Sequence, residues 1–532
     1  MNTKKIILLT LLVLFILFPI STFIPTSDLA IFLQGARTIV NGGKIYVDFI
    51  DIKPPIAYYS MVPIYLISNI DNHIVRLIEY FIHCLTAIGL GLYLYKKVNY
   101  KVGLFSAFAY SLLVVTLNTP ESFQLELIFN FLIILILIIH TNIFNKEIKK
   151  SFGLILLEGA IIGLYFSLKY TTGLILLGLL LFDIFYKKKK FLYFLKYYLI
   201  LALGFITSAL LCLLPLIDNQ TFNGYKDMLE FLRYYVNFVG TDIPSINVFL
   251  KYSSLYFVDK FSIAFIIATV FAIILWLKGR EQFSTSNKQF ILTLSIFLAS
   301  ALILSAIIER KGFAYHYSRS YIPLSIILGF GINEMVVYFK NRLKQKHLNI
   351  TIPTIIIILF LFVFSPISRF FAVLRIPIVY YFNNERYYDL FHEPQNNPIL
   401  NYRDKKKVGD FINTHSYPGE TVLTMNAGSY DIIQFQKLKV IDKFSHSGFY
   451  YGSHIKDKWR NDYLNQLKQA DWIIIQVNDF NFSANAHFRT TYESLQSDSV
   501  AMEIINSRFD KVFETETIYV YHKKQEINNP TH

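Results

Sequence analysis

The chain has 532 residues, of which 54% are hydrophobic and only 17% are charged, whereas a soluble domain typically carries about 25% charged residues. Its net charge of +14 does not indicate a nucleic-acid partner, because the basic excess lies in one part of the chain. Residues 1–370 carry 33 Lys and Arg against 18 Asp and Glu, whereas residues 371–532 carry 18 against 19. The lysines gather at the ends of apolar runs, which is the bias expected of a membrane protein.

Apolar runs of about 18 residues or more are long enough to cross a bilayer. The first run is too long for a signal peptide and has no small-residue cleavage site, so we expect it to stay as a helix. Basic clusters fall on alternate loops, which predicts a multi-pass protein of the plasma (inner) membrane with a cytoplasmic N-terminus. We predict eleven spans, at about 5–24, 73–95, 102–118, 122–141, 152–168, 171–186, 193–216, 256–277, 289–308, 320–339 and 350–370.

The first loop outside the cytoplasm, residues 25–72, begins with "SDLAIFLQGARTIVNGG". This stretch predicts a helix that starts at Asp28, ends at a pair of glycines and lies along the membrane surface with its apolar face. Asp28 either complements the dipole of this helix, which is the ordinary role of an acid in a first turn, or acts as a reactive carboxylate.

The same loop continues with "DIKPPIAYY". Pro54 and Pro55 must interrupt any helix, because proline lacks a backbone donor and keeps the preceding residue extended. Lys53 is either an ordinary interfacial lysine that reaches toward water or a cation that the rigid backbone presets. Tyr58 follows as a possible substrate contact.

Two further charged residues stand near the outer ends of later spans. Glu121 follows a proline in "NTPESFQLE" and is either a helix cap or a second acid of a site; Glu126, one turn deeper, could replace it. Lys169 in "GLYFSLKYTTG" runs against the positive-inside bias, and charge at membrane depth is costly. Lys169 is therefore a candidate functional cation.

The stretch "ERKGFAYHYSRSY" packs charges and aromatic residues between two spans. Arg310, Lys311, His316 and Arg319 could form an anion pocket there with aromatic walls, and Tyr317 is a possible substrate contact. A lone histidine beside tyrosines is nevertheless more often a hydrogen-bonded packing residue than a base or a ligand.

After residue 370 the pattern changes. "YRDKKKVGDFINTH" predicts an amphipathic helix, "TVLTMN" and "DWIIIQV" predict buried strands, and "DKVFETETIYVYHKK" predicts a strand or hairpin. This alternation indicates a small α/β domain at 371–532, outside the cytoplasm, after a transmembrane domain at 1–370. Asp431, His446 and His454 have no spacing that selects a metal, so we assign them no role and name no metal ligand.

Taken together, the predicted outer face offers carboxylates at Asp28 and Glu121 and cations at Lys53 and Lys169. Carboxylates suit general-base work on a hydroxyl group, and fixed cations suit a phosphate, including a phosphate that leaves with growing negative charge. A substrate with an anionic head and a membrane-soluble tail fits this combination.

The motifs resemble, in order and spacing, those of the C-type membrane glycosyltransferases, above all family 39, the protein O-mannosyltransferases and the lipid A aminoarabinose transferases. The resemblance covers the first ten predicted spans, about 340 residues, and rests on "SDLAIFLQGARTIVNGGKIYVDFIDIKPPIAYY", "TPESFQLEL", "GLYFSLKYTTGLILL" and "FAYHYSRSYIPL". It implies an essential acid at Asp28, a second at Glu121, a lipid-phosphate contact at Lys53 and a further conserved outer lysine at Lys169. We expect Lys169 to hold the lipid phosphate together with Lys53. Many relatives carry Asp-Glu where this chain has Asp28 and Leu29, so the role of that second acid is not carried over.

The resemblance implies a polytopic α-helical enzyme of the C-type glycosyltransferase fold. It would move a sugar, with inversion, from a polyprenyl-phosphate donor to a lipid, glycan or protein acceptor of the envelope. No cofactor is predicted, and a divalent cation stays open. Two alternatives also stay open, a transporter or flippase for a lipid-linked glycan and a non-enzymatic envelope assembly protein. Transporters usually show internal repeats and broken helices, which this sequence lacks.

Overall fold

The computed structural model describes residues 2–24, 27–69, 71–116, 123–143, 148–186, 191–238, 265–279, 287–309, 314–345, 366–392, 400–425, 432, 435–451, 455–479 and 490–524. The chain forms two compact units. The first, here called the helical unit, consists of Met1–Phe23, Arg76–Leu214 and Ile243–Ile378. The second, here called the mixed unit, consists of Ile24–Val75, Pro215–Asp242 and Val379–His532.

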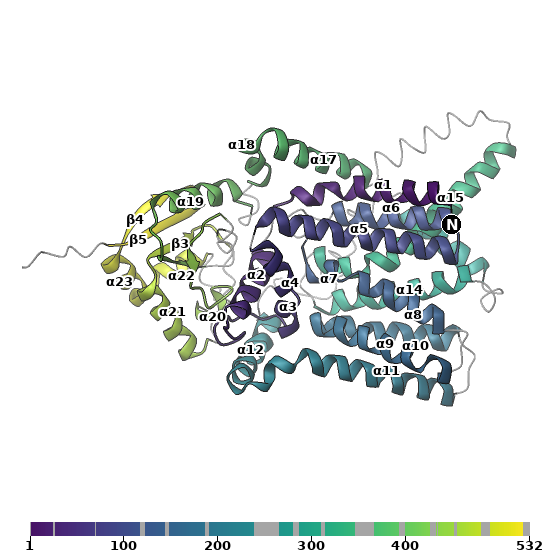
Figure 1. Ribbon diagram of the computed structural model, residues 1–532, viewed down its shortest axis with the longest axis horizontal. Coiled ribbons are helices and arrows are strands. Elements are labelled where there is room, and N and C mark those ends of the chain that lie inside the picture. Colours follow the sequence, from purple (N-terminus) through teal and green to yellow (C-terminus); the bar gives the residue numbers. More distant parts are fainter. Residues whose placement is uncertain are drawn as a thin grey trace, which may run out of the picture. The chain divides into compact units, whose positions relative to one another are not determined.

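The helical unit is built from apolar helices that run side by side (Figure 1). Short 3-10 helices (η) follow or precede several of them, where the chain turns at the end of a longer helix. Three of the helices, α5, η4 and α17, extend into segments of the mixed unit. The helices are α1 (Thr3–Leu17), η1 (Phe18–Thr22), α5 (Asn72–Lys97), α6 (Tyr100–Thr116), α7 (Leu125–Ile128), α8 (Phe131–Ile143), α9 (Ile148–Leu168), η3 (Tyr170–Leu174), α10 (Ile175–Tyr186), α11 (Phe191–Cys212), η4 (Leu214–Ile217), α14 (Asn287–Glu309), η6 (Ala314–Ser320), α15 (Tyr321–Gln345) and α17 (Pro366–Phe382).

Within the described residues, seven helical stretches are long and apolar enough to cross a membrane. The chain is therefore a multi-pass membrane protein, as predicted. The predicted spans at 256–277 and 350–370 fall partly outside the described residues, so the number eleven stays a prediction. The seven are Thr3–Thr22, His73–Lys97, Leu125–Ile143, Lys150–Leu168, Leu192–Cys212, Asn287–Glu309 and Tyr315–Asn341, and shorter apolar helices cover Tyr100–Thr116, Tyr170–Tyr186 and Phe265–Lys278.

Helices α9 and α11 approach closely because glycines lie at their contact. A Cβ atom added to Gly159 would lie 2.0 Å from the carbonyl oxygen of Leu201, and one on Gly163 would lie 2.4 Å from that of Phe205. Small residues four positions apart let two helix backbones approach each other inside a membrane. The "GAIIG" sequence of α9 therefore fixes α11 as its neighbour.

The mixed unit combines short helices with one five-stranded sheet. The sheet order is β2-β1-β3-β5-β4, with β1 parallel to both β2 and β3 and with β5 antiparallel to β3 and β4. The strands are β1 (Thr421–Thr424), β2 (Lys439–Val440), β3 (Trp472–Gln476), β4 (Phe509–Glu514) and β5 (Ile518–Lys523). The helices are α2 (Ser27–Val40), α3 (Pro55–Tyr59), α4 (Val62–Ser68), α12 (Asn219–Phe238), α18 (Asn384–Tyr387), η7 (Tyr388–Phe391), α19 (Tyr402–His415), α20 (Gly448–Tyr451), α21 (Asp457–Gln469), α22 (Thr491–Gln496) and α23 (Ser499–Arg508).

The predicted mixture of helices and strands after residue 370 is confirmed. The predicted amphipathic helix is α19, the two predicted buried strands are β1 and β3, and the terminal stretch forms the antiparallel pair β4 and β5. Strand β3 is buried along its whole length because it lies in the middle of the sheet, with β1 on one side and β5 on the other. Strand β2 was not predicted, since two residues are too few for a periodic pattern.

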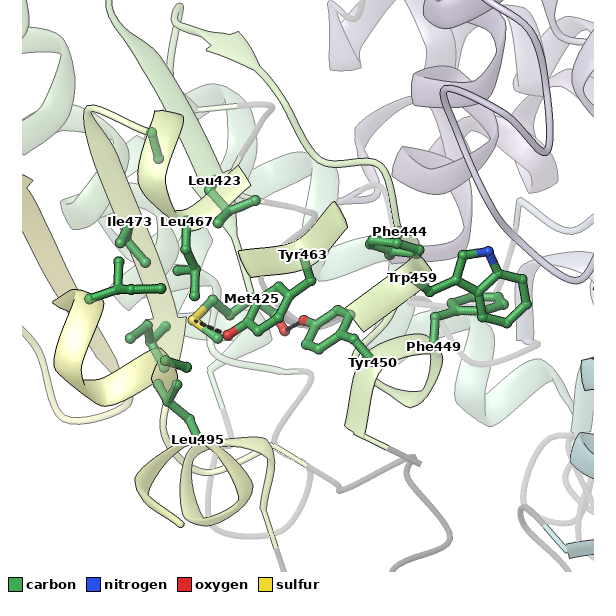
Figure 2. Packing of buried hydrophobic residues seen from close by; sticks show 14 of the residues in the cluster. Leu423, Met425, Phe444, Phe449, Tyr450, Trp459, Tyr463, Leu467, Ile473 and Leu495 are labelled. Carbon is green, nitrogen blue, oxygen red and sulfur yellow. Dashed lines mark hydrogen bonds between the residues drawn. The ribbon is translucent and has the colours of Figure 1, made fainter. Parts of the chain in front are cut away.

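Aromatic rings make up a large part of the core of the mixed unit, beside aliphatic side chains (Figure 2). The ring of Tyr450 stacks on that of Tyr463 with 4.0 Å between centroids, and the Tyr463 hydroxyl lies 3.8 Å from the sulfur of Met425. Phe231 of α12 joins this core, with its ring centroid 4.5 Å from that of Phe449. Helix α12 is thereby packed against the C-terminal part of the chain.

The first loop is also part of this unit. The backbone N–H of Ile50 donates to the carbonyl of Lys443 at 2.6 Å, and the N–H of Ser445 donates to the carbonyl of Ile50 at 3.0 Å. These two bonds form a short parallel bridge between Ile50 and Phe444. The sequence divides the chain near residue 370, whereas in the structure the first loop and the C-terminal part share one compact unit.

Candidate functional site

Asp28 lies in the first turn of α2. Residues 29–36 of this helix are all buried, so α2 packs inside the protein, and a position along the membrane surface stays a prediction. The side chain of Asp28 is 26% exposed. Its carboxylate is therefore held by a buried helix and still faces solvent.

The prolines fix the backbone next to Lys53, as the sequence predicts. Pro54 is extended, with φ −61° and ψ 155°, and Pro55 begins α3, where its missing N–H costs no helical hydrogen bond. The hydroxyl of Tyr46 donates to the carbonyl oxygen of Lys53 at 2.6 Å. The Lys53 carbonyl is therefore held by the Tyr46 hydroxyl, and the backbone after it is held by Pro54.

The ammonium group of Lys53 lies between two carboxylates. Its Nζ atom is 3.1 Å from Oδ1 of Asp28 and 3.6 Å from Oδ2 of Asp51. It also lies 4.9 Å from the centroid of the Phe32 ring, a distance at which a cation is attracted to an aromatic face. Lys53 is 24% exposed, so solvent still reaches it.

Asp51 is buried, and both of its carboxylate oxygens accept hydrogen bonds. Tyr58 donates to Oδ2 and Ser445 donates to Oδ1, each at 2.6 Å. Burial alone would raise the pKa of Asp51, but the Lys53 ammonium and the two hydroxyl donors lower it below its usual value. Asp51 is therefore a fixed negative charge at neutral pH.

Tyr58, a predicted substrate contact, is buried, and its hydroxyl donates a hydrogen bond to Asp51. Burial and the nearby Asp51 charge raise its pKa well above the usual value, so it remains a donor. Its ring packs onto Gly35 of α2, where an added Cβ would lie 2.3 Å from Cδ1 of Tyr58. Glycine at that position lets α2 and α3 meet.

His446 completes this group of residues in the mixed unit. Its Nδ1 accepts from the N–H of Gly448 at 3.1 Å, and its ring stacks on Phe449. Burial lowers its pKa to about 4, against the opposing effect of Asp51. His446 is thus neutral at pH 7. We call the group the Lys53 cluster; it consists of Asp28, Lys53, Asp51, Tyr58, Ser445 and His446.

The helical unit holds a second group of charges, here called the Arg319 cluster and made of Glu126, Lys169, Glu309, His316 and Arg319. The Nζ atom of Lys169 lies 3.0 Å from Oε1 of Glu126 and 3.3 Å from Oε2 of Glu309. Lys169 is 32% exposed, whereas the two acids are 4% and 10% exposed. Lys169 is therefore the member of this cluster that solvent reaches most.

Arg319 is fully buried beneath these groups. Its Nη1 atom lies 2.7 Å from Oε1 of Glu309 and donates to Thr171 and Ser305 at 2.8 and 3.0 Å, and its Nη2 atom lies 3.3 Å from Glu126. Such a guanidinium holds two carboxylates in place. In these contacts Arg319 binds protein groups rather than facing solvent.

Two of the other predicted site residues, His316 and Tyr317, are buried. Nδ1 of His316 lies 2.9 Å from Oε2 of Glu309, which makes His316 a member of the Arg319 cluster. Tyr317 is 2% exposed. Glu121 and Arg310 lie outside the described residues. Glu126, the sequence alternative to Glu121, is the acid that the structure brings to Lys169.

Sequence reasoning assigned no role to Asp51, Glu309 or Ser445. Asp51 stands in "DIKPPIAYY" and Glu309 stands in "ERKGFAYHYSRSY". Each is an acid one or two positions from a candidate cation, and this proximity is the signal that could have identified them. Ser445 carries no such signal, because it lies 394 positions from Asp51. Among the described residues, no group of three or more His, Cys, Asp and Glu side chains is arranged to hold a metal ion.

Comparison with known proteins adds information on the fold. No family model matches the sequence, and no curated protein matches it. The structure is similar to that of ArnT from Cupriavidus metallidurans bound to undecaprenyl phosphate, with a TM-score of 0.54, 11% identity and 99% coverage of both chains. The same ArnT in the apo state gives 0.55, 11% and 98% of both chains.

A third similar structure is the oligosaccharyltransferase AglB from Archaeoglobus fulgidus, in complex with an inhibitory peptide and a dolichol-phosphate. Its TM-score is 0.47 at 9% identity, over 98% of this chain and 74% of that one. The match to ArnT over nearly its whole length shows the fold of the C-type membrane glycosyltransferases, which confirms the predicted fold class. Activity does not follow from fold alone.

Proposed function

We propose that this protein is a membrane glycosyltransferase that takes its sugar from a polyprenyl-phosphate donor. The observation that carries the proposal is the Lys53 cluster. The carboxylate of Asp28 and the ammonium of Lys53, each about one quarter exposed, lie 3.1 Å apart. Asp28 is held by the buried helix α2, and Lys53 precedes two prolines and contacts the buried Asp51. A general base and a phosphate-binding cation are the two groups that such a transfer needs.

In the proposed reaction, Asp28 accepts the proton of an acceptor hydroxyl. The hydroxyl oxygen attacks the anomeric carbon of the sugar from the face opposite the phosphate. The bond between the anomeric carbon and the phosphate oxygen breaks, and its electron pair leaves with the phosphate. Lys53 stabilises the negative charge on that phosphate, and the configuration at the anomeric carbon inverts.

The remaining predicted residues keep their roles as proposals. Lys169 is a further phosphate contact, and its exposure among the members of the Arg319 cluster supports that role. Arg319 is better suited to holding Glu126 and Glu309 than to meeting a substrate, since it is fully buried. Glu121 and Arg310 stay candidates from the sequence alone.

The acceptor is a lipid, a glycan or a protein of the cell envelope, and the transfer takes place on the extracytoplasmic face. The face follows from the alternating basic loops rather than from the fold. Undecaprenyl phosphate in the similar ArnT structure supports a lipid phosphate as the carrier, because that ligand belongs to a protein of the same fold.

Two other functions compete with this proposal. A flippase for a lipid-linked glycan would also hold charges near the membrane, and an envelope assembly protein could use the mixed unit to bind a partner. Neither explains why a carboxylate should be paired with a cation that faces solvent. A transport path would instead place charged groups near the middle of the membrane, at breaks in helices.

Sugar transfer in proteoliposomes tests the proposal. The purified protein is reconstituted with a polyprenyl-phosphate-linked pentose or hexose carrying a radiolabel, together with envelope extract as the acceptor. Labelled product that depends on the protein supports a transferase. Movement of the labelled lipid across the bilayer without product would instead favour a flippase. If the protein shows neither activity, the envelope assembly role is the one that remains. Mass spectrometry of envelope glycans with and without the gene identifies the sugar and the acceptor.

A further inference from the structure

Ser445 connects the C-terminal part of the chain to the Lys53 cluster. Its hydroxyl donates to Oδ1 of Asp51 at 2.6 Å, and Oδ2 of the same carboxylate lies 3.6 Å from Nζ of Lys53. Ser445 and Asp51 are both buried. Hydrogen bonds from a hydroxyl to a carboxylate at this distance are among the stronger ones in proteins.

The backbone around Ser445 is held in two ways. The bridge between Ile50 and Phe444 aligns the two segments, so that the residues after each, Asp51 and Ser445, lie next to each other. The ring of Phe444 is packed in the aromatic core, 5.7 Å from the centroid of Tyr450 and 6.1 Å from that of Phe449 (Figure 2). Ser445 is therefore attached to the aromatic part of the core of the mixed unit.

This arrangement limits where Lys53 can lie. A lysine side chain has four rotatable bonds, and its ammonium moves freely unless its partners are fixed. Asp28 alone is a partly exposed partner, and such pairs hold a lysine only weakly. Asp51 is a better anchor, because both of its oxygens are tied by hydroxyl donors and its charge is buried.

We infer that Ser445 is a positioning residue for Lys53, acting through Asp51, and that the C-terminal α/β part of the chain thereby helps to build the candidate active site. Ser445 itself touches no substrate in this scheme. The expected effect of Ser445 on donor binding rests on the proposed function, in which Lys53 contacts the donor phosphate. The position of the Lys53 ammonium itself does not depend on that function.

The alternative is that the Ser445 hydroxyl only satisfies a buried carboxylate and affects stability alone. Ser447 provides a matched control. It is buried in the same segment, and its hydroxyl pairs with that of Thr491 at 3.0 Å rather than with the Lys53 cluster. Ser445→Ala and Ser447→Ala each remove one buried hydroxyl, and the two positions are only two residues apart.

The first measurement follows Lys53 directly. Purified full-length protein is treated briefly with an amine-acylating reagent, and the modification of Lys53 is quantified by mass spectrometry. Loss of the Ser445 hydroxyl should loosen Asp51 and raise the rate of Lys53 modification by about two- to tenfold, the usual worth of one hydrogen bond. Ser447→Ala should leave this rate at the wild-type value. Ser445→Cys keeps the size of the side chain but offers only a weak donor, so its rate of Lys53 modification should lie between those of the wild type and Ser445→Ala. It replaces Ser445→Ala if that variant does not elute as a single species.

The second measurement uses undecaprenyl phosphate as the probe. Ser445→Ala should weaken its binding by about two- to tenfold. In a Lys53→Ala background the same change should have no effect, because a residue that acts through Lys53 loses its influence when the lysine is gone.

The outcomes separate the inference from the proposed function. Unchanged Lys53 modification in both Ser445 variants, or a change equal to that in Ser447→Ala, overturns the inference whatever the lipid result. Altered modification with unaltered lipid binding upholds the positioning of Lys53 and counts against its phosphate role. A binding loss that persists in the Lys53→Ala background shows that Ser445 does not act through Lys53.

Discussion

The ammonium of Lys53 and the carboxylate of Asp28 form an ion pair at 3.1 Å between residues 25 positions apart. Both side chains are about one quarter exposed, so the pair itself stabilises the fold by no more than about 1 kcal/mol. Such a pair opens at little cost. A phosphate that competes for Lys53 would leave the Asp28 carboxylate available to a hydroxyl.

The first prediction concerns Asp28→Asn. The amide keeps the size and most hydrogen bonds, but it cannot accept a proton. Sugar transfer should fall by about 100- to 10,000-fold, the usual worth of general-base catalysis, while folding persists. Asp71→Asn is the control, because Asp71 caps α5 by accepting from the N–H groups of His73 and Ile74. Equal activity of the two variants would reduce Asp28 to a helix-terminal acid.

The second prediction concerns Lys53→Ala. A charge-assisted contact to phosphate is worth about 1.5–3 kcal/mol, so donor affinity should fall by about 10- to 150-fold. Lys53→Arg should restore only part of it, since a planar fork replaces a compact charge. Lys44→Ala removes a lysine from the same loop, one that pairs with Asp218 at 2.9 Å. Donor titration should show no change for Lys44→Ala, and a loss of the same size there would argue against a specific role of Lys53.

The third prediction concerns Lys169→Ala. Arg319 still pairs with Glu126 and Glu309 when Lys169 is removed, so Lys169→Ala should still fold. It should weaken donor affinity by about 10-fold or more. Lys288 is 34% exposed and pairs with Glu334 at 2.9 Å, which makes Lys288→Ala a matched control. A donor titration that cannot tell the two variants apart would remove Lys169 from the phosphate site.

The fourth prediction separates Arg319 from Lys169. Arg319→Ala would leave Glu126 and Glu309 buried without their guanidinium partner, and breaking a buried ion pair costs about 3–5 kcal/mol. Thermal unfolding in detergent should therefore show a large loss of stability for Arg319→Ala and a small one for Lys169→Ala. A stable, correctly eluting Arg319→Ala that loses only donor affinity would restore Arg319 to the substrate site.

The fifth prediction concerns pH. The pKa of His446 is about 4 in the folded protein, and a histidine in an unfolded chain has a pKa of about 6.5. Between these values the unfolded state binds more protons, so stability is fully present above pH 6.5 and falls as the pH drops toward 4. His446 should account for about 3 kcal/mol of the loss between pH 7 and pH 4.

The variant His446→Asn measures this effect, because its side-chain oxygen can accept from Gly448 as Nδ1 does. Its stability should change less with pH than that of the wild type over that interval. His415→Asn, at the exposed end of α19, is the control and should follow the wild type. Parallel pH curves for the wild type and His446→Asn would contradict the prediction.

The sequence by itself determined the class of the protein and most of its local structure. Runs of apolar residues indicate membrane helices because a bilayer leaves backbone groups no other partner than their own helix. The helix at Tyr402–His415 and the break before Pro55 followed from periodicity and from proline geometry, which act within a few residues. Asp28 and Lys53 could be singled out for the same reason, since each stands in a short stretch with an unusual local pattern.

Only the tertiary structure decided what these side chains touch. Nothing in the sequence places Ser445 beside Asp51, because a contact between residues 394 positions apart depends on the packing of the chain between them. The same holds for Arg319, whose pattern fits an anion pocket but which is buried against Glu126 and Glu309. A local pattern can show that a charged side chain stands where losing its hydration costs free energy. Which residue compensates by pairing with it depends on the tertiary packing.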